Sequence, residues 1–395
     1  MANYKFSAAV PEGTVDTVGE ILKVAASPNV ISFAGGLPAP ELFPVNELKQ
    51  ATDQVYDTSA ESALQYTNSE GFKKLREILA KRMAIRGVDC TADNIAITTG
   101  SQQSIDLISK MFINRGDTII VEKPTYMSAL DVFHTYGANV VGVDMDDQGM
   151  KMDALEAALR QNPETKFIYT VPTFQNPTGR TMPVARRQKM VELAKEYDVV
   201  IIEDDPYGQL RFAGEPVPAV KSFDTDGRVF YLSTFSKTLT PGLRTGWVVA
   251  DPDFIKQFTI IKQSADLHSD NVSQQAIADF LTDFDIDEHI AKIREVYGKR
   301  QRLMMECIER DFPVGVKYSH PEGGLFIWVE VPGNVNTQAL FDQCIKNNVA
   351  FVPGEPFFPG EVIPGTFRLN FSNMSEDKIK EGIARLGKAI KEFQG

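Results

Sequence analysis

The chain has 395 residues, 43% hydrophobic and 24% charged, a composition typical of a folded globular protein and not of a disordered or fibrous one. Its 41 basic and 53 acidic residues give a net charge of -12, which disfavours nucleic acid as a partner. The length favours two domains. No stretch resembles a signal peptide or approaches the roughly 18 apolar residues of a membrane helix, so we expect a cytoplasmic protein without membrane contact.

Strand-like and helix-like segments alternate through the first two thirds of the chain. Helical patterning at residues 104–113 and 182–197 indicates crossover helices between strands. Short β-rich runs predict seven strands, at residues 95–99, 118–121, 140–143, 166–171, 199–203, 229–233 and 247–250. We therefore predict an α/β fold in which a large domain contains a seven-stranded, mainly parallel sheet.

The pattern changes after Asp251, where a mostly helical stretch leads through residue 280 and then from 286 to 311. Three strand-like segments follow, at residues 325–331, 349–352 and 366–371. Two helix-like segments accompany them, at residues 337–346 and from 375 onward. These predict a smaller α+β domain. We assign residues 1–45 to an N-terminal segment that contributes to the small domain and the active-site entrance, 46–285 to the large domain and 286–395 to the small domain.

Metal chemistry has no support in the sequence. The three cysteines and four histidines are scattered along the chain, without the spacing of a disulfide framework or of a metal site. We expect reduced thiols and no bound metal.

The most distinctive polar segment follows the predicted strand at 229–233. It contains Thr234, Ser236 and Lys237, and Arg244 comes seven positions after the lysine. Ligands of open α/β sheets bind beyond the carboxyl ends of the strands, so Lys237 would supply an amine nucleophile and Arg244 an anion clamp. The alternative is an ordinary solvated lysine in a surface loop.

A second candidate site follows the strand at 95–99. Gly100 permits a tight turn, and Ser101 and Gln102 begin an apolar helix whose free amides would face a ligand such as phosphate. The alternative is an ordinary capped turn between strand and helix. The spacing matches neither a dinucleotide-binding glycine motif nor a nucleotide-binding P-loop.

Acidic residues end the strand at 199–203, where Glu203-Asp204-Asp205 is followed by Pro206 and Tyr207. Successive acids are normally solvated or cap a helix, and this interpretation stays open. A buried Asp204 would need a cationic partner, for which a protonated heterocyclic nitrogen is suitable.

Three further side chains are candidates. Asn176 lies in the turn Asn176-Pro177-Thr178-Gly179, which is a turn signal whatever its function. Arg368 lies in an apolar strand and would bind a carboxylate through two hydrogen bonds, or else form a structural ion pair. Tyr126 follows the strand at 118–121 and is either a ligand contact or a core aromatic.

In their order along almost the whole chain, these segments closely resemble the class I/II aminotransferases of pyridoxal-phosphate fold type I. The resemblance is nearest to the subgroup of 2-aminoadipate and broad-specificity aromatic aminotransferases, through residues 31–38, 203–207 and 236–239. It implies pyridoxal 5'-phosphate as the cofactor. It also implies the fold-type-I architecture of a large domain and a smaller α+β domain.

The resemblance implies a role for each candidate. Lys237 would hold the cofactor covalently and move a proton during catalysis, and Asp204 would pair with the ring nitrogen. Asn176 and Tyr207 would bind the ring oxygen, and Tyr126 would stack on the ring. The phosphate would contact Gly100, Ser101, Gln102, Thr234, Ser236 and Arg244.

Two further roles involve the partner subunit and the substrate. Tyr66 would reach the phosphate from the partner subunit, which implies a homodimer with shared active sites. Arg368 would take the substrate carboxylate, assisted by Asn176 and the backbone of Gly36.

The implied reaction moves an amino group from an amino acid to a 2-oxo acid, with 2-oxoglutarate as the expected acceptor, in a ping-pong sequence. No arginine precedes Arg76, whereas some 2-aminoadipate-preferring relatives use an N-terminal arginine for the distal carboxylate. We therefore expect aromatic or large aliphatic donors. The alternatives are a preference for 2-aminoadipate, a pyridoxal-phosphate lyase, or a ligand-sensing module, although about thirty residues before Ile31 are too few for a DNA-binding domain.

Overall fold

The computed structural model describes residues 4–10, 19, 23, 27 and 29–394. Its largest element is an eight-stranded sheet with the strand order β2-β9-β8-β7-β6-β3-β4-β5. The strands are β2 (Ile95–Thr98), β3 (Thr118–Lys123), β4 (Asn139–Asp146), β5 (Gly149–Met150), β6 (Phe167–Thr170), β7 (Val200–Asp204), β8 (Val229–Thr234) and β9 (Gly246–Val249). Strands β4, β3, β6, β7 and β8 are parallel, and β9 runs antiparallel to both β8 and β2.

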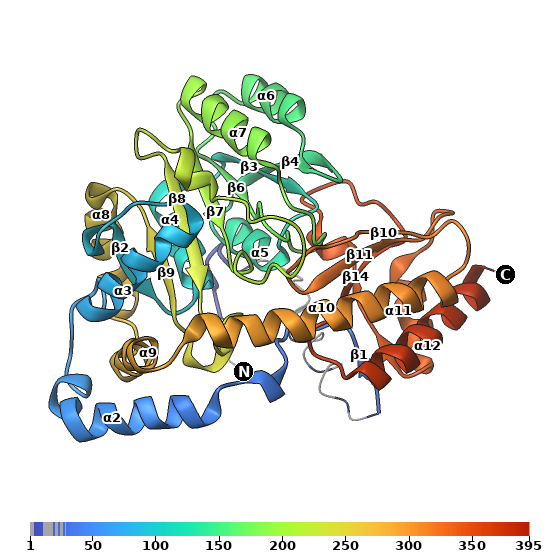
Figure 1. Ribbon diagram of the computed structural model, residues 1–395. Helices are drawn as coiled ribbons and strands as arrows, with labels where there is room; N and C mark the ends of the chain where they lie inside the picture. Colours follow the sequence, from blue (N-terminus) through green and yellow to red (C-terminus); the bar gives the residue numbers. More distant parts are fainter. Residues whose placement is uncertain (1–3, 11–18, 20–22, 24–26, 28, 395) are drawn as a thin grey trace.

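Helices cover both faces of this sheet (Figure 1). They are α3 (Lys73–Met83), α4 (Ser101–Phe112), α5 (Met127–Thr135), α6 (Met152–Gln161), α7 (Val184–Glu196), α8 (Pro252–Asp266) and α9 (Asn271–Asp283). Successive residues of a strand point to opposite faces. Thus Ile202 packs in the same apolar cluster as Ile105 of α4, whereas Ile201 packs with Met190 of α7.

All seven strands expected from the sequence form, and the two-residue β5 adds an eighth at the edge. The predicted fold class, α/β with a mainly parallel sheet, is confirmed. The crossover helices expected at residues 104–113 and 182–197 correspond to α4 and α7.

The C-terminal part has a separate four-stranded antiparallel sheet in the order β10-β11-β14-β13. Its strands are β10 (Lys317–Tyr318), β11 (Phe326–Glu330), β13 (Val352–Pro353) and β14 (Thr366–Asn370). Helices α11 (Thr337–Lys346) and α12 (Glu376–Gln394) accompany it. The strand expected at residues 349–352 is divided into β12 (Val349–Ala350) and β13, because the two halves pair with different neighbours.

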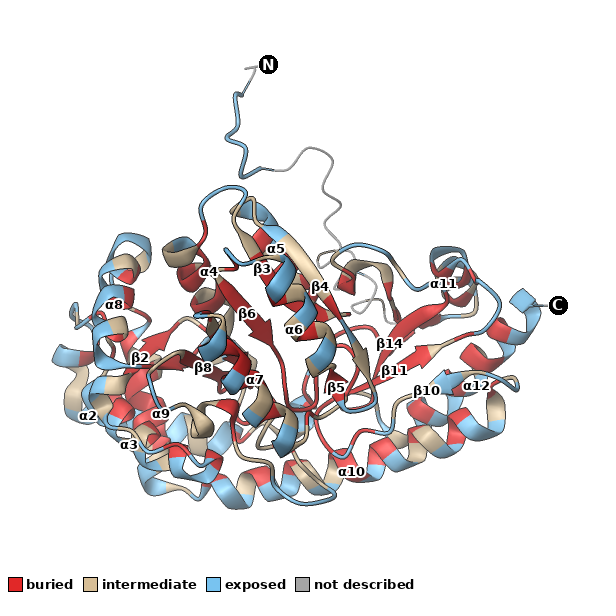
Figure 2. Ribbon diagram, turned by 90° about the horizontal axis from the view of Figure 1, so that it is seen from above, coloured by how far each residue is buried: buried red, intermediate tan, exposed pale blue. Residues whose placement is uncertain are grey.

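The start of the described chain joins this C-terminal part. Strand β1 (Ile31–Ser32) pairs with β12 in parallel, and the amide of Asn370 donates to the backbone oxygen of Phe33 over 2.8 Å. The long helix α10 (Ile286–Asp311) runs from beside α9 to α12, and buried residues are concentrated on its inner side (Figures 1 and 2). The domain boundaries at residues 45 and 285 stay a prediction, and much of residues 1–28 lies outside the described chain.

Helix α2 (Val45–Ala63) packs against α9.

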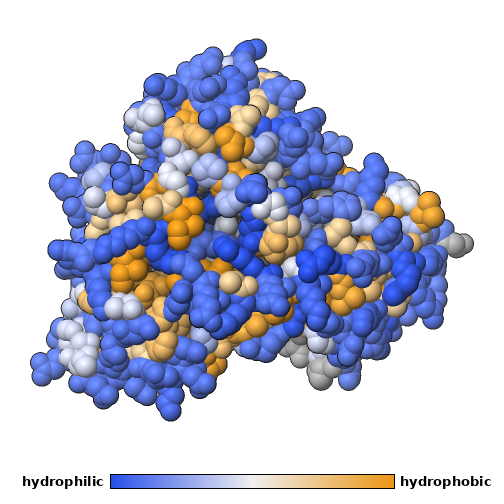
Figure 3. All heavy atoms as spheres, viewed as in Figure 1, coloured by the Kyte–Doolittle hydropathy of each residue, from blue (hydrophilic) through white to orange (hydrophobic). Residues whose placement is uncertain are grey.

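On the face shown in Figure 3 the surface is mostly hydrophilic, with hydrophobic side chains in small groups. No helix within the described ranges has the length and apolar character needed to cross a membrane.

Candidate active site

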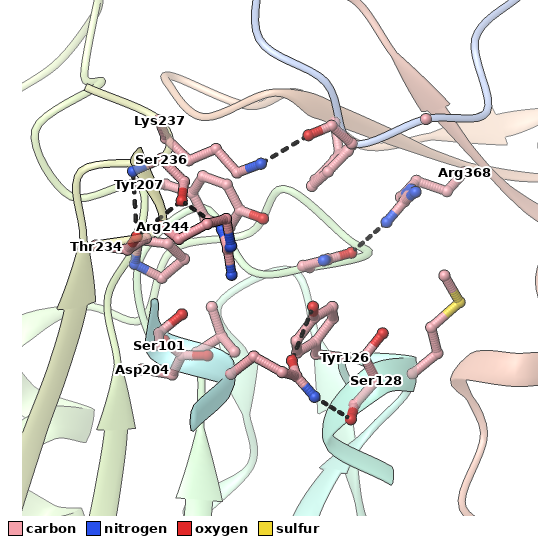
Figure 4. Close-up of a pocket in the computed structure, with 18 residues that line it drawn as sticks. Ser101, Tyr126, Ser128, Asp204, Tyr207, Thr234, Ser236, Lys237, Arg244 and Arg368 are labelled. Carbon is pink, nitrogen blue, oxygen red and sulfur yellow. Dashed lines mark hydrogen bonds between the residues drawn. The ribbon is translucent and has the colours of Figure 1, made fainter. Parts of the chain in front are cut away.

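A pocket lies at the carboxyl ends of the central strands, facing the C-terminal sheet. Ser101, Tyr126, Asn176, Asp204 and Lys237 follow or end β2, β3, β6, β7 and β8, respectively, so five separate strands supply one site (Figure 4). The pocket encloses about 230 Å³. Its lining comprises Gly35, Gly36, Ser101, Gln102, Tyr126, Met127, Ser128, Val171, Asn176, Asp204, Pro206, Tyr207, Thr234, Ser236, Lys237, Arg244, Phe326 and Arg368.

The amine of Lys237 lies inside this pocket. Its Nζ donates a hydrogen bond of 2.7 Å to the backbone oxygen of Gly36. Burial, together with the positive charges of Arg368 and Arg244, lowers the pKa of Lys237 to about 8. About a tenth of the amine is therefore neutral and nucleophilic at pH 7, far more than for an ordinary lysine. The solvated surface lysine is the wrong interpretation for this residue.

Asp204 ends β7 and is buried, with 3% of its surface exposed. Its Oδ2 accepts a hydrogen bond of 2.8 Å from the hydroxyl of Tyr169, and its Oδ1 has no partner within the described chain. Burial raises the pKa of Asp204 to about 7, and the hydrogen bond from Tyr169 opposes this shift. A buried carboxylate oxygen without a donor is costly, so a cationic N–H group at this place would stabilise the ionised form.

The two acids beside Asp204 are also buried, but they do not line the pocket. The carboxylate of Glu203 accepts hydrogen bonds of 2.8 Å from the backbone amides of Val220 and Lys221. Asp205 forms an ion pair with Arg86 at 2.8 Å. The three acids are therefore neither solvated nor alike, and Asp204 is the member of the run that faces the pocket.

One end of the pocket is built to receive an anion. Ser101 and Gln102 begin α4, where the first amides have no acceptor within the helix. Arg244 lies across the same space, with its Nη1 3.4 Å from the hydroxyl oxygen of Ser236. The hydroxyl oxygen of Thr234 accepts a hydrogen bond of 3.1 Å from the backbone amide of Ser236, so Thr234 helps to hold Ser236 in position.

Two glycines allow this end of the pocket to close tightly. Gly100 has a φ of 78°, and a Cβ atom there would lie 2.6 Å from Nη2 of Arg244. Gly100 is not part of the lining, but it lets the turn approach the guanidinium. A Cβ atom at Gly246 would lie 2.8 Å from both the Ser101 nitrogen and the Ser233 oxygen, so β9 must begin with a residue without a side chain.

The opposite end holds Arg368. Its Nη1 donates to Oδ1 of Asn176 over 2.7 Å and its Nη2 to the backbone oxygen of Ala34 over 2.8 Å. The guanidinium carbon lies 4.1 Å from the centre of the Phe326 ring, a cation–π arrangement. Burial lowers the pKa of Arg368 to about 10, which leaves it charged at neutral pH. The buried Nε has no acceptor within the described residues.

Two tyrosines line the middle of the pocket. Tyr207 is buried and packs edge-on against Phe326, with ring centres 5.8 Å apart, and burial raises the pKa of its hydroxyl. The hydroxyl of Tyr126 donates to Oε1 of Gln102 over 3.3 Å, and Nε2 of Gln102 donates to the backbone oxygen of Ser128 over 2.9 Å. Tyr126 is therefore tied to the anion-binding end.

Two predicted site residues are absent from the lining: Gly100, which lies directly behind it, and Tyr66, which lies away from the pocket of its own chain. The side chain of Tyr66 is 78% exposed and packs edge-on against the ring of His268, with centres 5.8 Å apart. Its proposed contact from a partner subunit stays a prediction.

The sequence interpretation did not assign Tyr169 and Phe326 to the site, nor the lining residues Gly35, Met127, Ser128, Val171 and Pro206. Tyr169 pairs with Ile202 in the β6–β7 register, and alternation along β7 places Asp204 on the same face, so the register contained a usable signal. Phe326 lies in the expected strand at 325–331, but its packing on Arg368 and Tyr207 required the tertiary arrangement.

The charges of the lining fit an anionic ligand. Three basic side chains, Lys237, Arg244 and Arg368, face one acidic side chain, Asp204. No cluster of three or more metal-binding side chains occurs within the described ranges. An amine of lowered pKa lies between two arginines at the edge of a mainly parallel sheet, an arrangement suited to an enzyme that uses a lysine on small anionic substrates.

Comparisons with known proteins agree with this class. The family model for aminotransferase class I and II matches residues 28–386. Aromatic-amino-acid aminotransferase 1 of Thermococcus litoralis is 45% identical over 380 residues, covering 95% of this chain and 91% of that protein. The 2-aminoadipate transaminase of Thermus thermophilus is 36% identical over 378 residues, covering 95% and 94%.

A solved aminotransferase structure is also similar to this chain. The kynurenine aminotransferase of Pyrococcus horikoshii, crystallised in complex with PMP, KYN and KYA, superposes with a TM-score of 0.94. It is 44% identical, with 98% of this chain and 97% of that chain covered. The chain belongs to the class I and II aminotransferase family. The family resemblance and the fold-type-I architecture expected from the sequence are confirmed.

Proposed function

We propose that this protein is a pyridoxal-5'-phosphate-dependent aminotransferase that moves an amino group from an aromatic or large aliphatic L-amino acid to a 2-oxo acid. We further propose 2-oxoglutarate as the acceptor and two half-reactions in ping-pong order. The observation that carries the proposal is the meeting of three groups in one pocket. These are the low-pKa amine of Lys237, the unpartnered Oδ1 of Asp204 and the guanidinium of Arg368.

The residues present fit this cofactor. This fit rests on Oδ1 of Asp204, which is buried without a hydrogen-bond donor from the described residues. A protonated pyridine nitrogen would supply that donor. Tyr126 would stack on the ring, while Asn176 and Tyr207 would bind its oxygen. The phosphate would be held by Ser101, Gln102, Thr234, Ser236 and Arg244 in the turn that Gly100 permits. When bound, the cofactor supplies an aldehyde carbon and a ring that accepts electrons.

The protein's own contribution is to orient the substrate and to move one proton. Arg368 would hold the substrate carboxylate in its planar fork, with Asn176 and the Gly36 backbone beside it. The substrate α-carbon would then face Nζ of Lys237, which accepts the proton when the amine is neutral. Because the pKa of Lys237 is about 8, the same amine can both take up and return a proton near neutral pH.

The donor preference rests on the absence of an arginine from the N-terminal part of the sequence. No arginine occurs before Arg76, so that segment offers no guanidinium to a second substrate carboxylate. The aromatic ring of Phe326 lies beside Arg368 and gives the carboxylate end an apolar neighbour. Similarity to an aromatic-amino-acid aminotransferase at 45% identity supports the same preference, whereas the 2-aminoadipate transaminase at 36% supports the alternative.

A homodimer with shared sites and a cytoplasmic location belong to this proposal. The hydroxyl of the exposed Tyr66 would donate a hydrogen bond to the phosphate of the partner's site. The three cysteines are all unpaired, which favours a reducing compartment.

The proposal is tested with a panel of amino donors and the purified holoenzyme. Loss of the cofactor's long-wavelength absorbance is followed in the first half-reaction, without acceptor, and turnover is then measured with 2-oxoglutarate. We expect phenylalanine, tyrosine and leucine to react with higher kcat/KM than 2-aminoadipate. A much higher value for 2-aminoadipate would reject the donor preference. Release of ammonia or carbon dioxide in place of stoichiometric 2-oxo acid would reject transamination.

A further inference from the structure

A hydrogen-bonded network lies behind the anion-binding turn, outside the pocket lining. Gln103, the third residue of α4, reaches back along the helix, and its Oε1 accepts the backbone amide of Thr99 over 2.8 Å. Its Nε2 donates to Oδ2 of Asp266 over 2.7 Å. Thr99 and Gly100 form the turn, and the backbone oxygen of Thr99 lies 3.5 Å from Nη2 of Arg244. The network therefore touches the turn and the arginine that would hold the cofactor phosphate.

Asp266 determines which way the Gln103 amide points. An ionised carboxylate only accepts hydrogen bonds, so Gln103 must present its NH2 group to Asp266 and its oxygen to Thr99. With the amide reversed, an oxygen would face the carboxylate and an NH2 group would face the Thr99 amide. Both contacts would be lost, and the turn would lose the acceptor that closes it.

Asp266 is itself held by Lys262, one turn earlier in α8. Nζ of Lys262 donates to Oδ1 of Asp266 over 2.6 Å, and the lysine side chain is completely buried. Asp266 is the last residue of α8, where an acid is disfavoured by the helix dipole. Helix stability thus gives no reason for an acid at this position, whereas the contacts to Gln103 and Lys262 do.

We propose that Asp266, held by Lys262, is a positioning residue for the phosphate end of the cofactor site. It acts on the Thr99–Gly100 turn mainly through Gln103, and also through a longer hydrogen bond of 3.5 Å that its Oδ2 accepts from the Thr99 hydroxyl. It contacts neither the pocket nor the reacting atoms. The inference rests on the proposed function and deepens it, because it concerns how this chain prepares its turn for a phosphate.

The test compares binding of three probes to the apoenzyme of the full-length protein. Pyridoxal 5'-phosphate reports the whole site, inorganic phosphate the anion-binding end, and pyridoxal the ring end without phosphate. The variants are Asp266→Asn and Gln103→Met. The control is Asp279→Asn, which breaks an ion pair of 2.8 Å with Lys74 on another part of the surface.

We expect Asp266→Asn and Gln103→Met each to weaken both phosphate-containing probes by about tenfold, the cost of one lost hydrogen bond to a charged group. Pyridoxal affinity should stay within about twofold, and Asp279→Asn should change none of the three. The double variant should lose clearly less affinity than the sum of the two single losses, because apart from a longer contact of 3.5 Å to the Thr99 hydroxyl Asp266 reaches the turn through Gln103.

Three results would overturn the role of Asp266. These are unchanged phosphate affinity in the variants, equal weakening of pyridoxal and phosphate, and additive losses in the double variant. If Asp266→Asn does not fold, Gln103→Met alone decides by the first two criteria. A wild-type chain that takes up neither phosphate-containing probe would instead overturn the proposed function, and this inference with it.

Discussion

The amine of Lys237 donates a hydrogen bond of 2.7 Å to the backbone oxygen of Gly36, a residue 201 positions earlier. Lys237 follows β8 of the large sheet, whereas Gly36 follows β1, which pairs with β12. The lysine therefore bridges the two parts of the molecule across the pocket. Any ligand that reacts with this amine must displace its contact with the N-terminal segment.

Capture of pyridoxal by the apoenzyme should depend on pH through Lys237. Below pH 8 the amine is increasingly protonated and is no nucleophile, so the rate should rise with pH and level off above about 8. An unperturbed lysine would reach this plateau only above about pH 10. Stopped-flow absorbance measures the rate. Lys237→Ala is the control and should abolish both capture and transamination while the thermal midpoint is kept, and wild-type activity in this variant would refute the assignment.

Asp204→Asn should change the pH dependence of apoenzyme stability. The folded pKa of Asp204, about 7, lies above its unfolded value of 3.8, so the wild-type free energy of unfolding falls as pH rises between these values. Between pH 5 and pH 8 the wild type should lose about 3 kcal/mol relative to the variant. Urea unfolding of both apoenzymes measures this loss. Parallel pH profiles would contradict the raised pKa.

Arg368→Lys should raise KM for amino-acid donors about 100-fold, because an ammonium cannot reproduce the planar fork. The lysine should also leave Oδ1 of Asn176 and the oxygen of Ala34 without their present donor. An amine without a carboxylate serves as the matched probe. Its reaction in the first half-reaction should change little, and an equal loss for both substrates would show that Arg368 does not bind the carboxylate.

Mixed dimers test whether Tyr66 acts across subunits. Tyr66→Phe alone should weaken binding of the cofactor, and Lys237→Ala alone should abolish turnover. In a hybrid of the two variants, the subunit with an intact Lys237 receives an intact Tyr66 from its partner, so one complete site should form. We expect recovery of wild-type cofactor affinity at half of the sites. A hybrid in which no site regains that affinity would place Tyr66 outside the partner's pocket.

Local sequence signals were sufficient for most of the elements. The predicted helix at residues 286–311 agrees with α10 because Asp285 caps the amides of Asp287 and Glu288. Helix α11 begins at residue 337, as predicted, since Asn336 caps the amide of Ala339. The interruption after residue 350 was not predictable in this way, because it depends on the different partners of β12 and β13.

The candidate site was predictable where a residue ends a strand. Asp204, Asn176, Tyr126 and Lys237 follow neighbouring strands, and parallel strands bring their carboxyl ends to one edge. Tyr66 could not be placed from its own chain, and Tyr169 gave no motif of its own.

By itself, the sequence determined the alternation of strands and helices, the family and the residue types at the sheet edge. Only the tertiary structure decided which acid of Glu203-Asp204-Asp205 faces the pocket. It also decided that the side-chain amide of Gln103 donates to Asp266, 163 residues away. Propensity and capping act over a few neighbouring residues. Burial and hydrogen-bond partners depend on segments that meet only after the chain has folded, and these set the pKa of each charged group.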